Sequence, residues 1–203
     1  MPKLKQIIPT NAPEQLNLNA GIFVKGMTIE ELQATVTGDV MVIPEENILG
    51  LSSGDISVSC VPTITDLGAD INGLKGKVAQ MQYITEYETS ISGTLVTASE
   101  EQIKMMIGSA ELTKTDGLTK ITPKEGFIDE TLFETIMLVG EKGANGIWIV
   151  ELKQSFNTGG FTQTSKNKDK STFDVELSGH YDIAALEECP MSFYTLTETG
   201  GGA

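Results

Sequence analysis

Near its C-terminal end the chain places Ser178, His180 and Asp182 at alternate positions, and these are the residue types of a catalytic triad. In a triad the His ring takes the proton of the Ser hydroxyl while the Asp orients the ring, so the three groups must converge. Here they belong to an alternating segment, and alternate side chains of a strand stand roughly parallel, about 6.6 Å apart. No Gly-x-Ser-x-Gly turn accompanies them. We therefore predict a solvated or interface histidine and no catalytic residue.

Two pairs of acidic residues are also spaced at alternate positions, Glu86 with Glu88 and Asp174 with Glu176. Paired carboxylates can divide the roles of general acid and general base when their surroundings separate their pKa values. Both pairs, however, belong to alternating segments whose other polar positions carry mostly Ser and Thr. The pairs are therefore interpreted as the water-facing sides of two strands.

Two segments in the middle of the chain partly match known loop motifs, one that binds phosphate and one that binds calcium. Gly68 and Gly73 have the spacing of a phosphate-binding loop, but that motif needs Lys directly after the second Gly, and Lys75 comes one position late. A calcium loop starting at Asp66 would need Gly at its sixth position, where Ile71 stands. Both segments are predicted to be ordinary turns, and no cofactor or metal ligand is assigned.

The composition of the chain bears on its partners. Its 203 residues include 28 acidic and 14 basic side chains, for a net charge of −14, and every basic residue is Lys. Arg, which is absent, supplies the planar fork that binds phosphates and base edges. An acidic surface repels polyanions, so tight binding of nucleic acid is not expected, although a polyanion sliding past without binding is compatible with it. With one His and no Arg, side chains for acid–base chemistry are few, and we predict that the protein is not an enzyme.

The two cysteines and the hydropathy of the chain bear on its compartment. Cys60 and Cys189 are far apart in sequence and match no metal-ligand spacing. They are predicted to be buried, unpaired thiols, in preference to a disulfide. No apolar run approaches the ~20 residues of a membrane-spanning helix, and no secretory signal is recognised. We expect a protein without a membrane span that is made in a cytoplasm.

Two strands near the C-terminal end are the clearest structural signal. Residues 171–182 alternate strictly, with apolar residues such as Leu177 on one face and polar residues such as Glu176 on the other. Residues 146–153 are almost continuously apolar and β-branched, which is typical of a strand covered on both faces. The polar residues between these two strands are predicted to form an exposed tip. Together they indicate a large antiparallel β framework.

Shorter patterns predict the remaining elements. Strands are expected at residues 21–25, 34–43, 78–96, 132–139 and 191–196. One helix begins at Ser99, which forms a capping box with Gln102, and a single helical turn is expected at 28–33. The predicted organisation is an extended arm at 1–19, one domain at 20–197 with a long loop at 44–76, and a flexible tail at 198–203.

The order of these elements matches a known layout. An arm precedes the strand at 21–25, a long loop follows the second strand, and a later strand runs into residues 97–104 and their helix. The two strands predicted at 146–153 and 171–182 then follow, with short characteristic sequences at 151–154, 159–161 and 173–182. In this the chain resembles the major tail tube proteins of long-tailed bacteriophages and related prophages.

The resemblance implies a fold, an assembly and a location. The fold would be a mainly β, antiparallel sandwich or flattened barrel flanked by one α-helix. Subunits would form hexameric rings that stack into a hollow tube for DNA delivery, in the tail of a virion assembled in the host bacterial cytoplasm. Partners would be further copies of the chain, with tape measure, tail-tip and terminator proteins, while DNA passes through the lumen.

The resemblance also implies roles for particular residues. The acids expected to face the lumen are Glu86, Glu88, Asp174 and Glu176. The apolar residues expected to contact other subunits are Leu4, Ile7, Ile8, Ile48, Leu49, Leu51, Ile64 and Leu67. The loop at 44–76 is expected to become ordered on assembly.

Two alternatives stay open. One is a monomeric β-sandwich that binds a carbohydrate or a protein, although such modules usually display several exposed aromatics and this chain has one Trp and four Tyr. The other is a different virion component, such as a tail terminator or a baseplate hub. Stacked rings would favour the tube, single rings the other virion component, and a monomer with glycan affinity the binding module.

Overall fold

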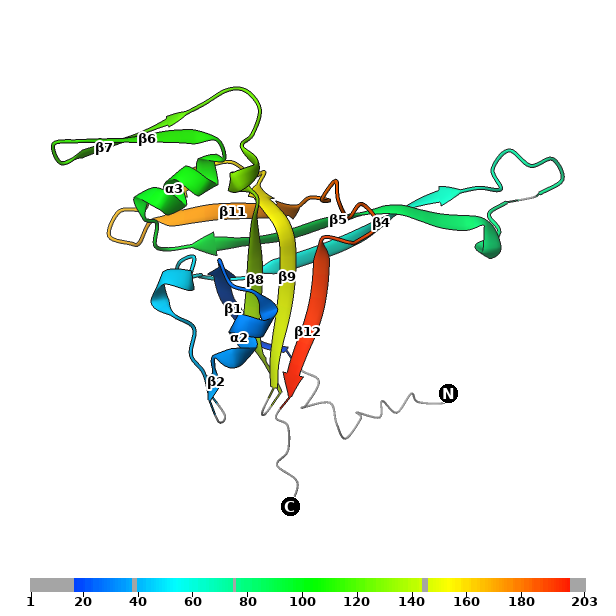
Figure 1. The fold of residues 1–203 in the computed structure, drawn as a ribbon, viewed down its shortest axis with the longest axis horizontal. Helices are drawn as coiled ribbons and strands as arrows, with labels where there is room; N and C mark the ends of the chain where they lie inside the picture. Colours follow the sequence, from blue (N-terminus) through cyan, green and yellow to red (C-terminus); the bar gives the residue numbers. More distant parts are fainter. Residues whose placement is uncertain (1–16, 38–39, 75, 144–145, 198–203) are drawn as a thin grey trace, which may run out of the picture.

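The computed structural model describes residues 17–37, 40–74, 76–143 and 146–197 (Figure 1). Antiparallel strands dominate it, which confirms the predicted mainly β fold. The strands are β1 (Asn17–Lys25), β2 (Val36–Thr37), β3 (Val40–Met41), β4 (Ser57–Asp66), β5 (Gln82–Leu95), β6 (Ala110–Thr115), β7 (Leu118–Pro123), β8 (Glu134–Lys142), β9 (Gly146–Asn157), β10 (Thr162–Thr164), β11 (Thr172–Gly179) and β12 (Met191–Thr197). The helices are α2 (Ile29–Ala34) and α3 (Glu100–Ile107), with 3-10 turns η1 (Glu45–Asn47), η2 (Ala79–Met81) and η3 (Glu130–Leu132).

Eight strands form one antiparallel sheet that bends into two layers. Their order is β1-β8-β9-β11-β5-β4, with β12 beside β9 and β10 beside β11. Strand β9 joins the layers, because its residues 146–152 pair with β12 whereas residues 155–157 pair with β11. In Figure 1, β8, β9 and β12 run down the view while β11, β5 and β4 run across them. The fold is therefore an antiparallel β-sandwich, as predicted.

The main core lies between the two layers. Phe23 of β1 and Leu138 of β8 share one apolar cluster with Ile91 of β5 and Leu177 of β11, and all four are buried. Met106 of α3 belongs to the same cluster. Removing this apolar surface from water is the main stabilising contribution to the sandwich.

A second apolar cluster covers the opposite face of β8 and β9. Met137 and Ile149 belong to it, and Leu32 of α2 packs over them. Val150 and Leu152, which alternate with Ile149 along β9, lie in the main core. Strand β9 is therefore buried on both faces, which confirms the prediction made from its continuous apolar run.

Strand β11 has the alternation that its sequence predicts. Val175 and Leu177 are buried in the main core, while Asp174 and Glu176, which alternate with them, are exposed. The strand thus has an inner apolar face and an outer polar face, and it brings the polar residues to the surface of the molecule.

Helix α3 begins where the sequence predicts. The Ser99 hydroxyl accepts the backbone N–H of Gln102, and the Gln102 side chain accepts the N–H of Ser99, so the capping box is complete. In the first turn the Glu100 carboxylate accepts the Thr119 hydroxyl at 2.6 Å and pairs with the Lys114 ammonium at 2.9 Å. These two contacts join the β6–β7 hairpin to α3, and together they lower the pKa of Glu100.

Two predicted segments are wrong. The strand expected at 34–43 is instead the end of α2 followed by β2 and β3, because Thr28 and Glu31 form a capping box and Leu32 anchors the helix in the second core. The long loop expected at 44–76 contains β4, which pairs with β5 along ten residues. Much of β4 lies outside the core, so it lacks the one-sided apolar pattern that identifies a strand.

Two boundaries also change. Strand β1 begins at Asn17, so residues 17–19 belong to a strand and not to the predicted arm. The stretch between α3 and β8, predicted as a loop, contains the β6–β7 hairpin. The rest of the predicted arm, and the tail at 198–203, lie outside the described residues.

Candidate assembly surfaces

Four acidic side chains gather on the outer face of strands β5 and β11: Glu86, Glu88, Asp174 and Glu176. Antiparallel pairing sets Asp174 opposite Thr94 and Glu176 opposite Ser92. From Ser92 the same face of β5 continues through Ser90 to the two glutamates, and all four carboxylates are exposed. We call this surface the acid face. The structure thus brings together all four acids that the sequence singled out.

Hydroxyl side chains and one valine occupy the neighbouring positions of the acid face. Strand β4 contributes Ser57, Ser59 and Thr63, together with the exposed Val61, which pairs with Glu88. The Thr94 hydroxyl donates a 3.0 Å hydrogen bond to Asp174 Oδ1. None of the paired positions described on this face carries Lys, so its negative charge is not balanced locally.

Buried Asn157 fixes the backbone beneath the acid face. Its side-chain carbonyl accepts the N–H of Glu176 at 3.0 Å, and its amide group donates to the carbonyl of Met106 and, at 3.0 Å, to that of Gly160. It therefore ties the end of α3 to β11. The sequence placed Asn157 in an exposed tip, which is wrong because the residue is 3% exposed.

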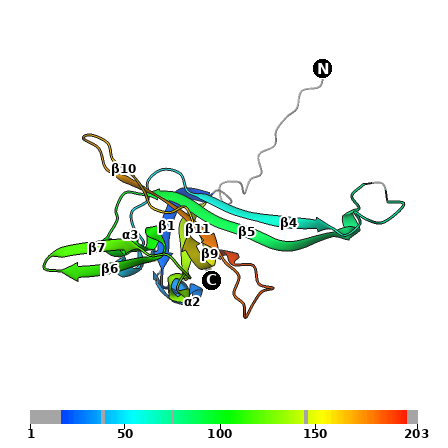
Figure 2. The ribbon, with the colours of Figure 1, turned by 90° about the horizontal axis from the view of Figure 1, so that it is seen from above.

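Strands β4 and β5 continue beyond the end of β11 as a two-stranded arm that leaves the body of the molecule (Figures 1 and 2). We define this arm as residues 61–74 and 76–87. None of its described residues belongs to either apolar core. It nevertheless exposes large apolar side chains, each 43–62% accessible: Val61, Ile64, Leu67, Ile71, Tyr83 and Ile84. Large apolar side chains exposed in this number on one hairpin make it a candidate interaction site.

The residues predicted to contact other subunits divide into three groups. Leu51, Ile64 and Leu67 are exposed, and Ile48 is half-buried where it bridges β1. Leu49 is fully buried in the main core and its N–H donates to the Phe23 carbonyl at 2.9 Å, so its predicted role is wrong. The predicted residues outside the described part of the chain are Leu4, Ile7 and Ile8.

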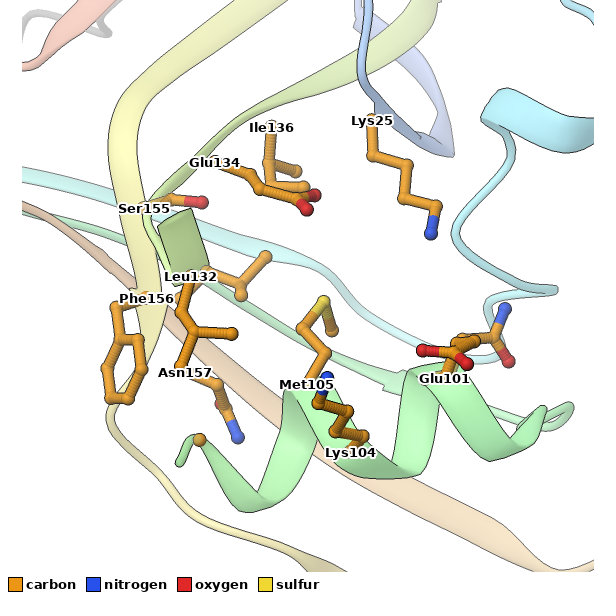
Figure 3. Close-up of a pocket in the computed structure, with 13 residues that line it drawn as sticks. Lys25, Glu101, Lys104, Met105, Leu132, Glu134, Ile136, Ser155, Phe156 and Asn157 are labelled. Carbon is orange, nitrogen blue, oxygen red and sulfur yellow. The ribbon is translucent and has the colours of Figure 1, made fainter. Parts of the chain in front are cut away.

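A cavity of about 120 Å³ lies between α3 and the adjoining parts of β8 and β9 (Figure 3). Ser155 and Glu134, which face each other on β9 and β8, line one side, and Lys25 and Met105 line others. Ser155 is 3% exposed and its hydroxyl makes no hydrogen bond to the described part of the chain. Among the described residues, therefore, no side chain is hydrogen-bonded to this hydroxyl as the base of a nucleophilic serine would be.

The three residues of triad type have separate partners. The Ser178 hydroxyl bonds to that of Thr158 at 2.7 Å, and His180 Nδ1 lies 3.2 Å from the Gln154 carbonyl. Asp182 accepts the N–H of Ala184 at 2.8 Å. Each side chain stabilises its own local backbone or strand, so the geometry offers no proton relay among them.

Cys60 and Cys189 lie side by side despite their separation in sequence. Both thiols are free and half-buried against the main core, where the sequence predicted full burial. Burial, followed by the neighbouring Cys189, raises the pKa of Cys60. Nothing in their spacing predicted this contact.

Of the six exposed apolar residues of the arm, the sequence predicted contacts for only two, Ile64 and Leu67. The four that it did not predict are Val61, Ile71, Tyr83 and Ile84. A signal was present in Pro62, because a proline inside a strand is typical of an edge that reaches away from the centre of a sheet.

Comparison with known proteins adds no identity to these surfaces. No protein-family model matches the sequence, and no curated protein matches it significantly. Within the part of the chain that the structure describes, no helix has both the length and the apolarity to cross a membrane.

Proposed function

We propose that this chain is a structural subunit of a bacteriophage tail tube, which forms hexameric rings that stack into a hollow conduit for DNA. The observation that carries the proposal is the arm, a long hairpin that exposes large apolar side chains and covers no core of its own. A two-stranded hairpin is marginally stable in water by itself. Its exposed apolar residues are best explained by a surface that receives them in the assembled state.

A second copy of the chain is the partner that this geometry favours. An arm that leaves one subunit and docks on a different patch of the next makes a heterologous contact, and repetition of that contact closes a ring. Strand β4 lies at the edge of the sheet and pairs only with β5 among the described strands. Its free edge supports the same interpretation, because an unpaired strand edge is a template for pairing with another chain.

The acid face is assigned to the lumen under this proposal. It is a sheet surface with four carboxylates, intervening hydroxyls, one valine and no Lys at its described paired positions. Such a wall keeps phosphates at a distance by like-charge repulsion, so DNA slides through without binding. Tape measure protein would occupy the lumen before DNA, while tail-tip and terminator proteins would close the ends of the tube in the virion.

Assembly of the purified protein tests the proposal. Negative-stain electron microscopy at high concentration, together with sedimentation, is expected to reveal stacked rings or hollow tubes. Single rings that never stack would indicate a terminator or baseplate hub. Monomers that persist even when tail-tip complexes are supplied as nuclei would contradict the proposal and favour a monomeric binding module.

Neutralising the acid face tests the lumen assignment separately. The variant carries Glu86→Gln, Glu88→Gln, Asp174→Asn and Glu176→Gln, which preserve side-chain shape and the acceptor that Thr94 uses. We expect tubes of normal appearance but reduced infectivity of particles built from them, because DNA loses the repulsion that keeps it off the wall. Changing Glu45 and Glu46 to Gln in η1, away from the acid face, is the control. Normal infectivity of the quadruple variant would contradict the assignment.

A further inference from the structure

We propose that Cys60 and Cys189 form a disulfide bond. The bond would fix the arm root, which is the Cys60–Thr89 pair and its neighbours next to the arm, to the body of the molecule. The inference goes beyond the proposed function and does not depend on it, because it uses only contacts within one subunit.

Cys60 stands at the point where the arm begins. It pairs with Thr89 of β5. The adjacent residue of β5, Ser90, pairs with Ser178, where the pairing of β11 with β5 ends. The segment that leads into β12 crosses at this point, since a Cβ placed on Gly179 would lie 2.6 Å from the Thr89 hydroxyl and 3.2 Å from Cβ of Pro190. Cys189 therefore reaches the arm root from the opposite layer of the sandwich.

Packing brings the two cysteines to the same place. Both pack against the main apolar cluster, and both Thr89, the partner of Cys60, and Pro190, which follows Cys189, lie beside Gly179. A disulfide joins cysteines whose Cα atoms are about 4.4–6.8 Å apart, so it requires the close approach of two segments that this packing provides. Because desolvation by burial raises the pKa of Cys60, its thiolate is scarce at neutral pH and exchange with an oxidant is faster at mildly alkaline pH.

The bridge would reinforce a weakly held junction. Besides the β4–β5 pairing, a 2.7 Å hydrogen bond from the Tyr87 N–H to the Tyr181 hydroxyl holds the arm root in the described part of the chain. A covalent link from β4 to the segment before β12 would limit rotation of the arm about this junction. It would also close a chain loop of well over one hundred residues, which restricts the unfolded chain strongly.

The reaction balances with a small-molecule disulfide as oxidant. One protein thiolate attacks a sulfur of glutathione disulfide, which breaks the S–S bond and releases one glutathione thiolate. The second protein thiolate then attacks the protein sulfur of this mixed disulfide and releases the other glutathione. The protein loses two hydrogen atoms, and the oxidant is reduced to two glutathione molecules.

The test treats the full chain with glutathione disulfide at mildly alkaline pH and follows it by intact mass, iodoacetamide labelling and thermal unfolding. The wild type is expected to lose two hydrogen atoms in mass, to resist labelling after denaturation, and to unfold roughly 10 °C higher. Dithiothreitol should reverse all three changes. Hydrogen exchange at the Tyr87 amide should slow on oxidation.

The single variants Cys60→Ser and Cys189→Ser are matched controls, since each keeps one thiol and cannot form the internal bridge. They should gain no thermal stability and should carry at most one glutathione. A wild type that retains glutathione on both cysteines, or that forms disulfide-linked dimers instead, would overturn the proposal. An internal bridge that leaves exchange at Tyr87 unchanged would overturn the assigned effect on the arm.

Discussion

Replacing Ile64, Leu67 and Ile84 with Asp is expected to abolish ring and tube formation while leaving the monomer folded. All three side chains are more than 40% exposed in one subunit and none belongs to an apolar core. Burial of a large apolar side chain contributes about 1.5–3 kcal/mol, and a carboxylate at the same position adds a desolvation cost. The concentration needed for assembly should therefore rise at least ~100-fold. Sedimentation and electron microscopy measure it.

The matched control replaces Leu118 with Asp. Leu118 lies on β7 and is 69% exposed, so the change in surface chemistry at that site is similar. The proposed function gives β7 no role in assembly, and this variant should form tubes at the wild-type concentration. Thermal unfolding of both variants within a few degrees of the wild type would establish that the monomers are folded. Tube formation by the triple arm variant would remove the arm from the interface.

The sequence predicted best those elements that bury one face or both. Strand β11 alternates because its inner residues enter the main core, and β9 is continuously apolar because a second cluster covers its other face. Helix α3 was predicted from its capping box, a local interaction that needs no tertiary information. Strand β4 was missed because the arm is solvated on both faces, so its apolar residues follow no simple period.

The β6–β7 hairpin had a local signal that the sequence analysis did not use. Asp116 and Gly117 occupy its turn, both with positive φ, at 42° and 81°. Consecutive positive φ values define the type I′ turn, and Asp-Gly is among its preferred sequences. The hairpin was therefore predictable from two residues, whereas its docking on α3 through Glu100 was not.

The candidate surfaces were predicted only in part, because they depend on strand register. Alternation placed Asp174 and Glu176 on the polar side of one strand, and Glu86 and Glu88 on the polar side of another. The two polar sides form one surface because β11 pairs with β5, and these strands are about eighty residues apart in the sequence. The contact of Cys60 with Cys189 depends on the same long-range arrangement, which no local pattern encodes.

Replacing Phe23 with Ala is expected to cost about 3–5 kcal/mol of unfolding free energy, a large part of the 5–15 kcal/mol typical of a folded domain. The Phe23 ring spans the main core from β1 to β5, where a Cβ placed on Gly93 would lie 3.3 Å from it. Its removal leaves a cavity between the two layers, which β9 alone joins through continuous pairing. We expect the thermal midpoint to fall by roughly 10 °C.

Phe193→Ala is the control of the same residue type, since Phe193 of β12 is 63% exposed. Its truncation removes little buried surface and should cost less than about 1 kcal/mol. A loss below that value for Phe23→Ala would contradict the central position assigned to this ring. Because the acid face lies on the outer side of β5 and β11, whose inner side packs around Phe23, a loosened core should also disturb the acid face. Tubes that form from Phe23→Ala should accordingly be fewer and less regular than those formed by Phe193→Ala.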